Sequence, residues 1–137
     1  MAEAVAAIEE ETGTQAGISL FDGTTHTSAG SVGTLPAWST IKIPIAVAAQ
    51  EYCSYDEATL AQLTSASIEY SDNDAASSLW TCLGHESEAS QIVGEEIAKG
   101  GMSVQVEPYF GTTVWPVPAQ ARYAHHLASL PEDHPVI

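Results

Sequence analysis

Trp38-Ser39-Thr40-Ile41-Lys42-Ile43-Pro44-Ile45-Ala46 opens an apolar stretch that continues to Glu51. Pro44 fits the first turn of a helix, where its missing N–H group costs nothing. The stretch therefore predicts a helix that begins close to Ser39. Because this helix is apolar on nearly all sides, we expect it to lie buried at the centre of the fold.

Ser39 and Lys42 have the spacing of a nucleophile and its base. Residues three apart are neighbours on one face of a helix, so we expect the Lys42 amine to reach the Ser39 hydroxyl. A serine hydroxyl is a weak nucleophile, and an amine activates it when burial favours the neutral amine. The first turn also offers backbone N–H groups to an oxyanion. The alternative is a helix-capping serine followed by a lysine that extends to solvent.

A second motif, Ser71-Asp72-Asn73, lies between two predicted helices, 32 residues after Ser39. It offers a hydroxyl for proton transfer and an amide that can hold a substrate carbonyl. Alone, such a cluster is typical of turns and helix N-caps. The ordered pair S-x-x-K and S-D-N is typical of β-lactamases and penicillin-binding proteins.

On these motifs the chain resembles the serine β-lactamase and D-Ala-D-Ala peptidase superfamily, in particular the β-lactamase-like serine hydrolases of actinobacteria. The resemblance covers nearly all 137 residues. It implies that Ser39 is the acylated nucleophile, Lys42 the general base and Ser71 the proton shuttle. It further implies that Asn73 binds the substrate amide, and that the substrates are β-lactams or D-alanyl peptides of peptidoglycan.

Two features of the sequence depart from the family. Its third motif, K-[TS]-G on a late strand, has only Lys99-Gly100-Gly101 as a candidate, and this follows a predicted helix. Glu107 resembles the deacylating glutamate of class A enzymes, but its loop is short and lacks the usual asparagine, which favours a surface glutamate. An acyl-enzyme without that base would turn over slowly. These departures keep open a non-catalytic module that binds peptidoglycan or a protein partner, and also a plain acidic helical domain with chance motifs.

The rest of the sequence predicts an α+β fold that is mostly helical. Residues 102–115 are expected to be irregular. The predicted elements are helices over 2–11, 57–68, 75–82, 86–99 and 116–130, and a β-hairpin over 15–28. We expect one domain over 1–137, with the N-terminal helix and hairpin in 1–30 and a helical subdomain in 31–137. The resemblance implies that this domain is incomplete, because the C-terminal strands are absent. A C-terminal fragment or self-association would then complete the sheet.

The composition limits the classes of partner. The chain has eighteen acidic residues and three basic ones, which gives a net charge of −15. Such a charge makes nucleic acid a poor partner. No stretch is long and apolar enough to span a membrane, and residues 1–8 carry acid where a secretory signal needs base. The resemblance implies the cell envelope or the exterior, and a cytoplasmic location stays open.

Cys53 and Cys82 are the two cysteines, and their spacing favours two buried free thiols. A disulfide is the alternative, because two helices that start side by side at the site would end roughly 21 and 17 Å from it. No cofactor or metal site is expected, since no pair of histidines has the i, i+4 spacing of metal ligands. The five histidines are His26, His85, His125, His126 and His134.

Overall fold

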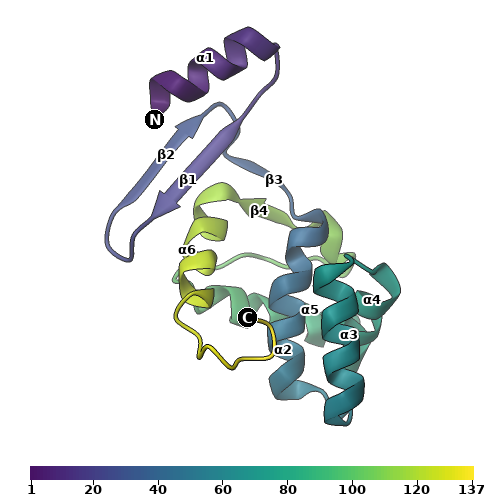
Figure 1. The fold of residues 1–137 in the computed structure, drawn as a ribbon. Helices are drawn as coiled ribbons and strands as arrows, with labels where there is room; N and C mark the ends of the chain where they lie inside the picture. Colours follow the sequence, from purple (N-terminus) through teal and green to yellow (C-terminus); the bar gives the residue numbers. More distant parts are fainter.

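The computed structural model describes every residue from Met1 to Ile137 and has an α+β fold that is mostly helical, with two small antiparallel sheets. Helix α2 (Lys42–Tyr52) lies at its centre and packs against α3 (Glu57–Glu69), α4 (Asn73–Cys82) and α5 (Glu86–Ala98) (Figure 1). Its residues from Pro44 to Ala49 are all buried. The predicted buried central helix is therefore confirmed.

Helix α4 begins two residues earlier than the sequence predicted. The sequence predicted a helix over 75–82. Instead, the Asp72 side chain accepts a hydrogen bond from the Ala75 N–H at 2.7 Å and caps the helix, so that Asn73 is its first residue. Asp72 is the N-cap of α4, because its carboxylate satisfies a free N–H group of the first turn.

The N-terminal part contains α1 (Ala2–Thr12) and a hairpin of β1 (Gly17–Phe21) and β2 (His26–Gly30). The hairpin confirms the predicted one, and Asp22 closes its loop by accepting N–H bonds from the two threonines that follow. Figure 1 shows α1 and the hairpin at one end of the molecule and α2 to α5 at the other. Helix α6 (Val117–Leu127) lies between them and packs on β1.

A second sheet was not predicted. Strand β3 (Thr34–Pro36) pairs antiparallel with β4 (Val114–Pro116), which closely follows a 3-10 turn, η2 (Phe110–Thr112). The expectation that 102–115 is irregular is therefore wrong at its C-terminal end. Each strand has three residues and the partners lie far apart in sequence, so no local pattern reveals them. Helix α6 is also shorter than the expected 116–130: it begins after Pro116, which belongs to β4, and it ends at Leu127.

Cys53 and Cys82 form a disulfide, with their Cα atoms 5.4 Å apart. The favoured reading of two free thiols is wrong, and the alternative is right. Helices α2 and α4 lie side by side and both begin near Ser39, so their C-terminal ends bring the two cysteines together. Only the packing of the two helices decides this.

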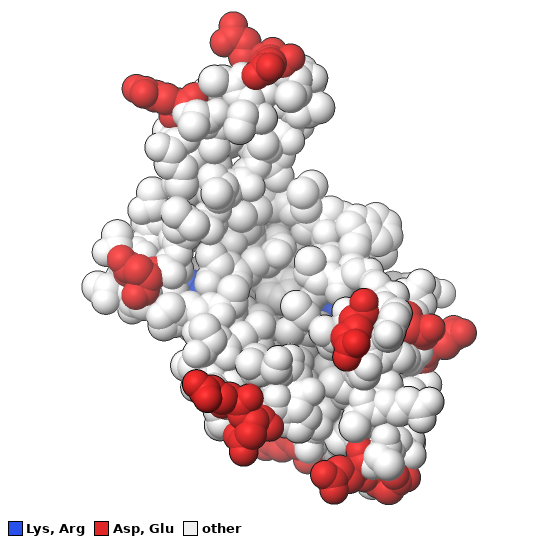
Figure 2. Space-filling model, in the orientation of Figure 1, with Lys and Arg blue, Asp and Glu red and all other residues white.

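The core is one cluster of buried apolar side chains around α2, which includes Ile45, Leu79, Val93 and Trp115. None of the helices has the length and apolar character that a membrane crossing requires. In Figure 2 the acidic side chains lie around the edge of the face shown, and its hollowed centre consists mainly of uncharged side chains.

Candidate active site

Ser39 lies in a 3-10 turn, η1 (Trp38–Ile41), directly before α2. Trp38 starts this turn with a φ of 46°, a left-handed conformation that is uncommon for residues other than glycine. Thr40 donates its N–H (3.0 Å) and its hydroxyl (2.6 Å) to the Ala37 carbonyl. The Ala37 N–H donates in turn to the Thr113 carbonyl at 2.8 Å. These bonds fix the backbone around the serine.

Ser71 is held opposite Ser39 by the short connection between α3 and α4. Its φ of 54° is left-handed, and the following residue, Asp72, caps α4. Trp38 and Ser71 are the only two non-glycine residues with a positive φ in the structure. Such conformations cost about 1–3 kcal/mol each and are found preferentially at functional sites. Both lie next to or within the two motifs.

The serines and the lysine of the two motifs form one chain of hydrogen bonds. Ser71 Oγ donates to Ser39 Oγ at 2.9 Å, and Lys42 Nζ donates to Ser71 Oγ at 3.0 Å. Lys42 Nζ also donates to the Ser71 carbonyl. The i, i+3 spacing predicted a direct contact between Lys42 and Ser39. The structure instead connects them through Ser71, because the lysine side chain extends to two acceptors on the connection between α3 and α4.

The direction of these hydrogen bonds follows from the charge state of Lys42. An ammonium group has donors only, so Ser71 accepts from it and donates onward to Ser39. A neutral amine has a lone pair, and both bonds then reverse. In the reversed chain Ser39 donates to Ser71 and Ser71 donates to Lys42. This order carries a proton away from Ser39 and leaves a nucleophilic oxygen.

Lys42 is shielded from solvent. Its exposed fraction is 3%, and Ile41 and Ile45 beside it are fully buried. No carboxylate oxygen lies within 4.0 Å of Lys42 Nζ, since the ion pairs of the chain involve Lys99 and His126. A buried amine needs hydrogen-bond partners, and here the two Ser71 oxygens provide them. Ser71 therefore positions the lysine as well as contacting the nucleophile.

A hollow of about 250 Å³ lies beside this chain of hydrogen bonds. Its lining residues are Ser39, Thr40, Lys42, Ile43, Ser67, Ile68 and Ser71. The Ser39 N–H has no hydrogen-bond partner within the protein and lies three residues before the start of α2. A free N–H at the N-terminal end of a helix is the type of donor that stabilises an oxyanion.

Ser67 is a candidate that the sequence did not reveal. It lies on α3, is 1% exposed, and its hydroxyl has no hydrogen-bond partner in the protein although it lines the same hollow. A buried hydroxyl without a partner costs about 1–3 kcal/mol. The only signal in the sequence is its place four residues before Ser71, and nothing there distinguishes it from Ser65.

Asn73, Trp38 and Tyr70 are exposed residues close in sequence to Ser39 and Ser71. Asn73 is the first residue of α4, is exposed, and has no side-chain hydrogen bond within the protein. Trp38 and Tyr70, which directly precede the two serines, are 66% and 78% exposed. Large exposed aromatic side chains are typical of binding surfaces. None of these three residues lines the hollow beside Ser39.

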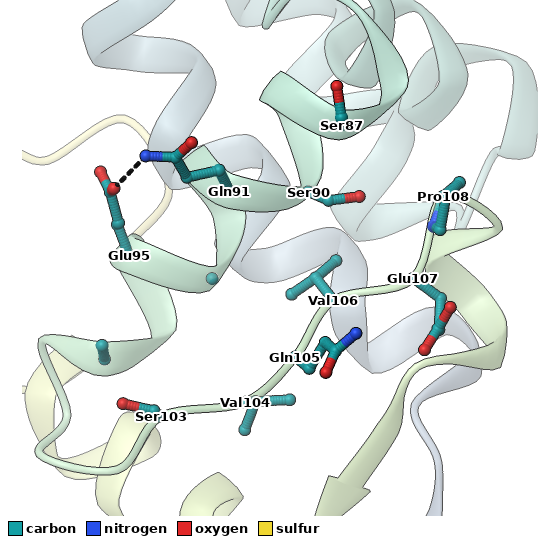
Figure 3. Close-up of a pocket in the computed structure, with 12 residues that line it drawn as sticks. Ser87, Ser90, Gln91, Glu95, Ser103, Val104, Gln105, Val106, Glu107 and Pro108 are labelled. Carbon is teal, nitrogen blue, oxygen red and sulfur yellow. Dashed lines mark hydrogen bonds between the residues drawn. The ribbon is translucent and has the colours of Figure 1, made fainter.

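Glu107 lies in a different groove from Ser39. This groove, of about 530 Å³, runs between α5 and residues 103–108, and it shares no lining residue with the hollow at Ser39 (Figure 3). Glu107 is exposed, and its N–H donates to Thr113 Oγ1 at 3.0 Å. The structure thus does not bring Glu107 together with the other candidate residues.

Lys99 belongs to a polar cluster on α5 and α6. It pairs with the buried Glu96 at 2.6 Å and with Glu51 at 3.7 Å, and it caps the C-terminus of α5 rather than lying on a strand. The Tyr123 hydroxyl donates to Glu96 at 3.0 Å, and burial together with this carboxylate raises the pKa of Tyr123 far above its usual range. The hydrogen bond to Glu96 likewise raises the pKa of Lys99.

No group of three histidine, cysteine or acidic side chains in the structure is arranged to hold a metal ion. The histidine closest to a carboxylate is His126, whose Nε2 lies 3.8 Å from Glu96 Oε1. A comparison with models of known protein families and a search of curated proteins both find no match to this chain. The geometry of the residues must therefore carry any proposal about function.

Proposed function

We propose that this protein is a serine acyl-transfer hydrolase of the β-lactamase and D-Ala-D-Ala peptidase type, which acts on β-lactam or D-alanyl peptide amides through an acyl-enzyme at Ser39. The observation that carries the proposal is the chain of hydrogen bonds from Lys42 through Ser71 to Ser39. Two motifs that are 32 residues apart meet at hydrogen-bond distance beside one hollow. A capping serine and a solvent-reaching lysine would not produce this contact, and Lys42 is buried.

Acylation follows from the reversed hydrogen bonds. Ser39 Oγ attacks the amide carbonyl carbon and passes its proton to Ser71 Oγ, which passes its own proton to the neutral Lys42 amine. The negative charge that develops on the carbonyl oxygen is stabilised by the free Ser39 N–H. The carbon–nitrogen bond then breaks, and the departing nitrogen takes a proton that returns through Ser71. The product is an ester between the acyl group and Ser39.

Hydrolysis of this ester requires a base that activates water. Glu107 lines a separate groove, and Lys42 is the only ionisable side chain that lines the hollow beside Ser39. We therefore propose that deacylation is slow and that the acyl-enzyme accumulates, as in a penicillin-binding protein. The proposal includes the cell envelope or exterior as the location, because the Cys53–Cys82 disulfide suits an oxidising compartment.

The experiment that tests the proposal is intact mass spectrometry after incubation with benzylpenicillin. Opening of the β-lactam ring expels no group, so the protein should gain the full mass of the drug. Ser39→Ala should abolish the gain, and Ser54→Ala, an exposed serine outside the hollow, should leave it unchanged. No gain with benzylpenicillin and with a fluorophosphonate serine probe, or an equal gain in Ser39→Ala, would contradict acyl transfer.

A second candidate function is binding without catalysis, to peptidoglycan or to a protein partner. The observation that favours it is the pairing of Lys99 with Glu96, because that lysine is then not available to a substrate carboxylate. Tryptophan fluorescence with a D-Ala-D-Ala pentapeptide distinguishes the two functions. If the wild type and Ser39→Ala bind the pentapeptide equally and neither is acylated by any probe, the protein is a binding module.

A further inference from the structure

A hollow of about 570 Å³ lies between the connection from α4 to α5 and the 3-10 turn η2. Its lining comes from residues 77–81 of α4, from residues 84–86 and from residues 108–111. The volume is in the range of small-molecule sites. No lining residue is shared with the hollow beside Ser39, so this is a separate candidate site.

Tyr109 contributes a freely exposed aromatic ring to this hollow. It is 85% exposed, the largest fraction among the exposed large hydrophobic residues of the chain. Its backbone is nevertheless fixed, because the Tyr109 carbonyl accepts bonds from the N–H and the hydroxyl of Thr112, both at 2.8 Å. The next residue, Phe110, packs on Trp80 with ring centroids 5.2 Å apart. The hollow therefore has a firm aromatic wall and one free ring, which together offer an apolar surface to a ligand.

The same hollow contains polar groups without hydrogen-bond partners in the protein. Trp80 is only 7% exposed, yet its indole N–H has no partner and is accessible to solvent. Because Trp80 lines no other hollow, this N–H is available to a ligand here. The other unpartnered groups are the Ser77 hydroxyl, the His85 ring and the Glu86 carboxylate. The aromatic wall is thus accompanied by both donors and acceptors.

These groups disfavour several classes of ligand. No lysine or arginine lines the hollow, so a phosphate or carboxylate has no cation to pair with. A purely apolar ligand would leave the polar groups that it covers without partners, at a cost of about 1–3 kcal/mol each. A cation would meet the positive edge of the indole, while the face of the Trp80 ring, the strongest binder of cations, is buried.

A sugar ring meets both requirements of the hollow. Its hydroxyl groups donate and accept hydrogen bonds, and its C–H face packs on an aromatic ring. We propose that the hollow between α4, α5 and η2 binds a sugar ring of an oligosaccharide. The ring stacks on Tyr109, and its hydroxyl groups bond to the Trp80 indole N–H, to His85 and to Glu86. This site is separate from Ser39 and does not depend on acyl transfer.

The test follows the indole N–H signals of the three tryptophans by NMR while the full chain is titrated with cellotriose and with chitotriose. Trp80→Phe assigns the Trp80 signal. At least one trisaccharide should shift this signal in a saturable way and leave that of Trp115, which is 2% exposed and lines no hollow, unchanged. Tetramethylammonium chloride, the probe for a cation site, should not shift it. No saturable shift with either trisaccharide, or a shift with tetramethylammonium alone, would overturn the proposal.

Variants of Tyr109 locate the ligand. Tyr109→Ala should weaken binding at least about tenfold, whereas Tyr109→Phe, which keeps the ring, should weaken it less than about threefold. Tyr55→Ala, at an exposed tyrosine outside the hollow, is the matched control and should bind as the wild type does. Because Tyr109 is exposed, its replacement should not disturb the fold, and circular dichroism checks this. Equal binding by Tyr109→Ala and Tyr55→Ala would overturn the stacking of the sugar on Tyr109.

Discussion

At the scale of single residues, Ser71 has the central place in the candidate site. It contacts the nucleophile and the lysine at once, and it does so from a left-handed backbone conformation. No hydrogen bond joins the side chains of Ser39 and Lys42 directly in the structure. The reactivity of Ser39 is therefore expected to depend on Ser71 as strongly as on Lys42.

Replacement of Ser71 tests this dependence. Ser71→Ala should slow acylation of Ser39 by benzylpenicillin about 10²-fold to 10³-fold, because the route for the proton is lost. The measurement is the rate of mass gain after mixing. Ser71→Gly should be equally slow but more stable to heat than Ser71→Ala, since glycine adopts the positive φ without strain. Ser78→Ala, on the exposed side of α4, is the matched control. Rates for Ser71→Ala and Ser78→Ala that agree would exclude Ser71 from the proton path.

At the scale of elements, α2 and α4 form a unit that is tied at both ends. One end carries the contact between Ser39 and Ser71, and the other carries the disulfide between Cys53 and Cys82. The disulfide closes a loop with a sequence separation of 29 residues. We expect it to hold the two helices in register, so that the serines stay within hydrogen-bond distance.

Reduction of the disulfide should therefore lower both stability and reactivity. A loop of this length corresponds to about 3.6 kcal/mol of stabilisation, or a decrease in Tm of about 10 °C for a chain of this size. Differential scanning calorimetry with and without a reductant measures the change. The double variant Cys53→Ala with Cys82→Ala should have the Tm of the reduced wild type, both with and without the reductant. A wild-type Tm that does not respond to the reductant would mean that the bond contributes nothing.

Glu9 ties α1 to the connections on both sides of the hairpin. Its carboxylate accepts hydrogen bonds from the Ala16 N–H at 2.8 Å and from the N–H and hydroxyl of Ser31. These bonds, the one from Ala16 first, lower the pKa of Glu9 below its usual value. A lowered pKa means that the stabilisation is complete above the pKa of an unfolded glutamate and is lost as the pH falls through the folded value.

Loss of this carboxylate should therefore loosen α1. Glu9→Gln should increase amide hydrogen exchange in residues 2–12 several-fold at neutral pH, because a neutral amide is a weaker acceptor. Glu10→Gln, on the exposed side of the same helix, should leave the exchange unchanged. Below the folded pKa of Glu9, the wild type and Glu9→Gln should exchange alike. A difference between them that persists at low pH would assign the effect to packing rather than to charge.

At the scale of the whole molecule, the acidic surface dominates the electrostatics. The net charge is −15, and two of the three cations are engaged within the fold: Lys99 pairs with Glu96, and Arg122 lies 4.2 Å from the centre of the Phe21 ring. The third, Lys42, is buried. The exposed carboxylates therefore repel one another with little compensation.

Screening of this repulsion should stabilise the protein. An increase of NaCl from about 0.02 M to about 0.5 M shortens the distance over which charges interact and should raise Tm by a few degrees at neutral pH. The increase should shrink near pH 4, where many carboxylates are protonated. Calorimetry at the two pH values measures both effects. A Tm that falls with salt at neutral pH would show that attractive pairs outweigh the repulsion.

Local signals in the sequence predict the helices and the first hairpin, because hydrophobic periodicity, prolines and caps lie within a few residues of each other. The sequence also named Ser39, Lys42 and Ser71, since their spacing is a property of the chain. Contacts between distant segments were decided only by the tertiary structure. They are the pairing of β3 with β4, the Cys53–Cys82 bond, the link from Lys42 to Ser39 through Ser71, the buried Ser67 and the position of Glu107. Each depends on how α2, α3, α4 and the 102–116 segment pack against one another, and packing is a collective property that no local pattern encodes.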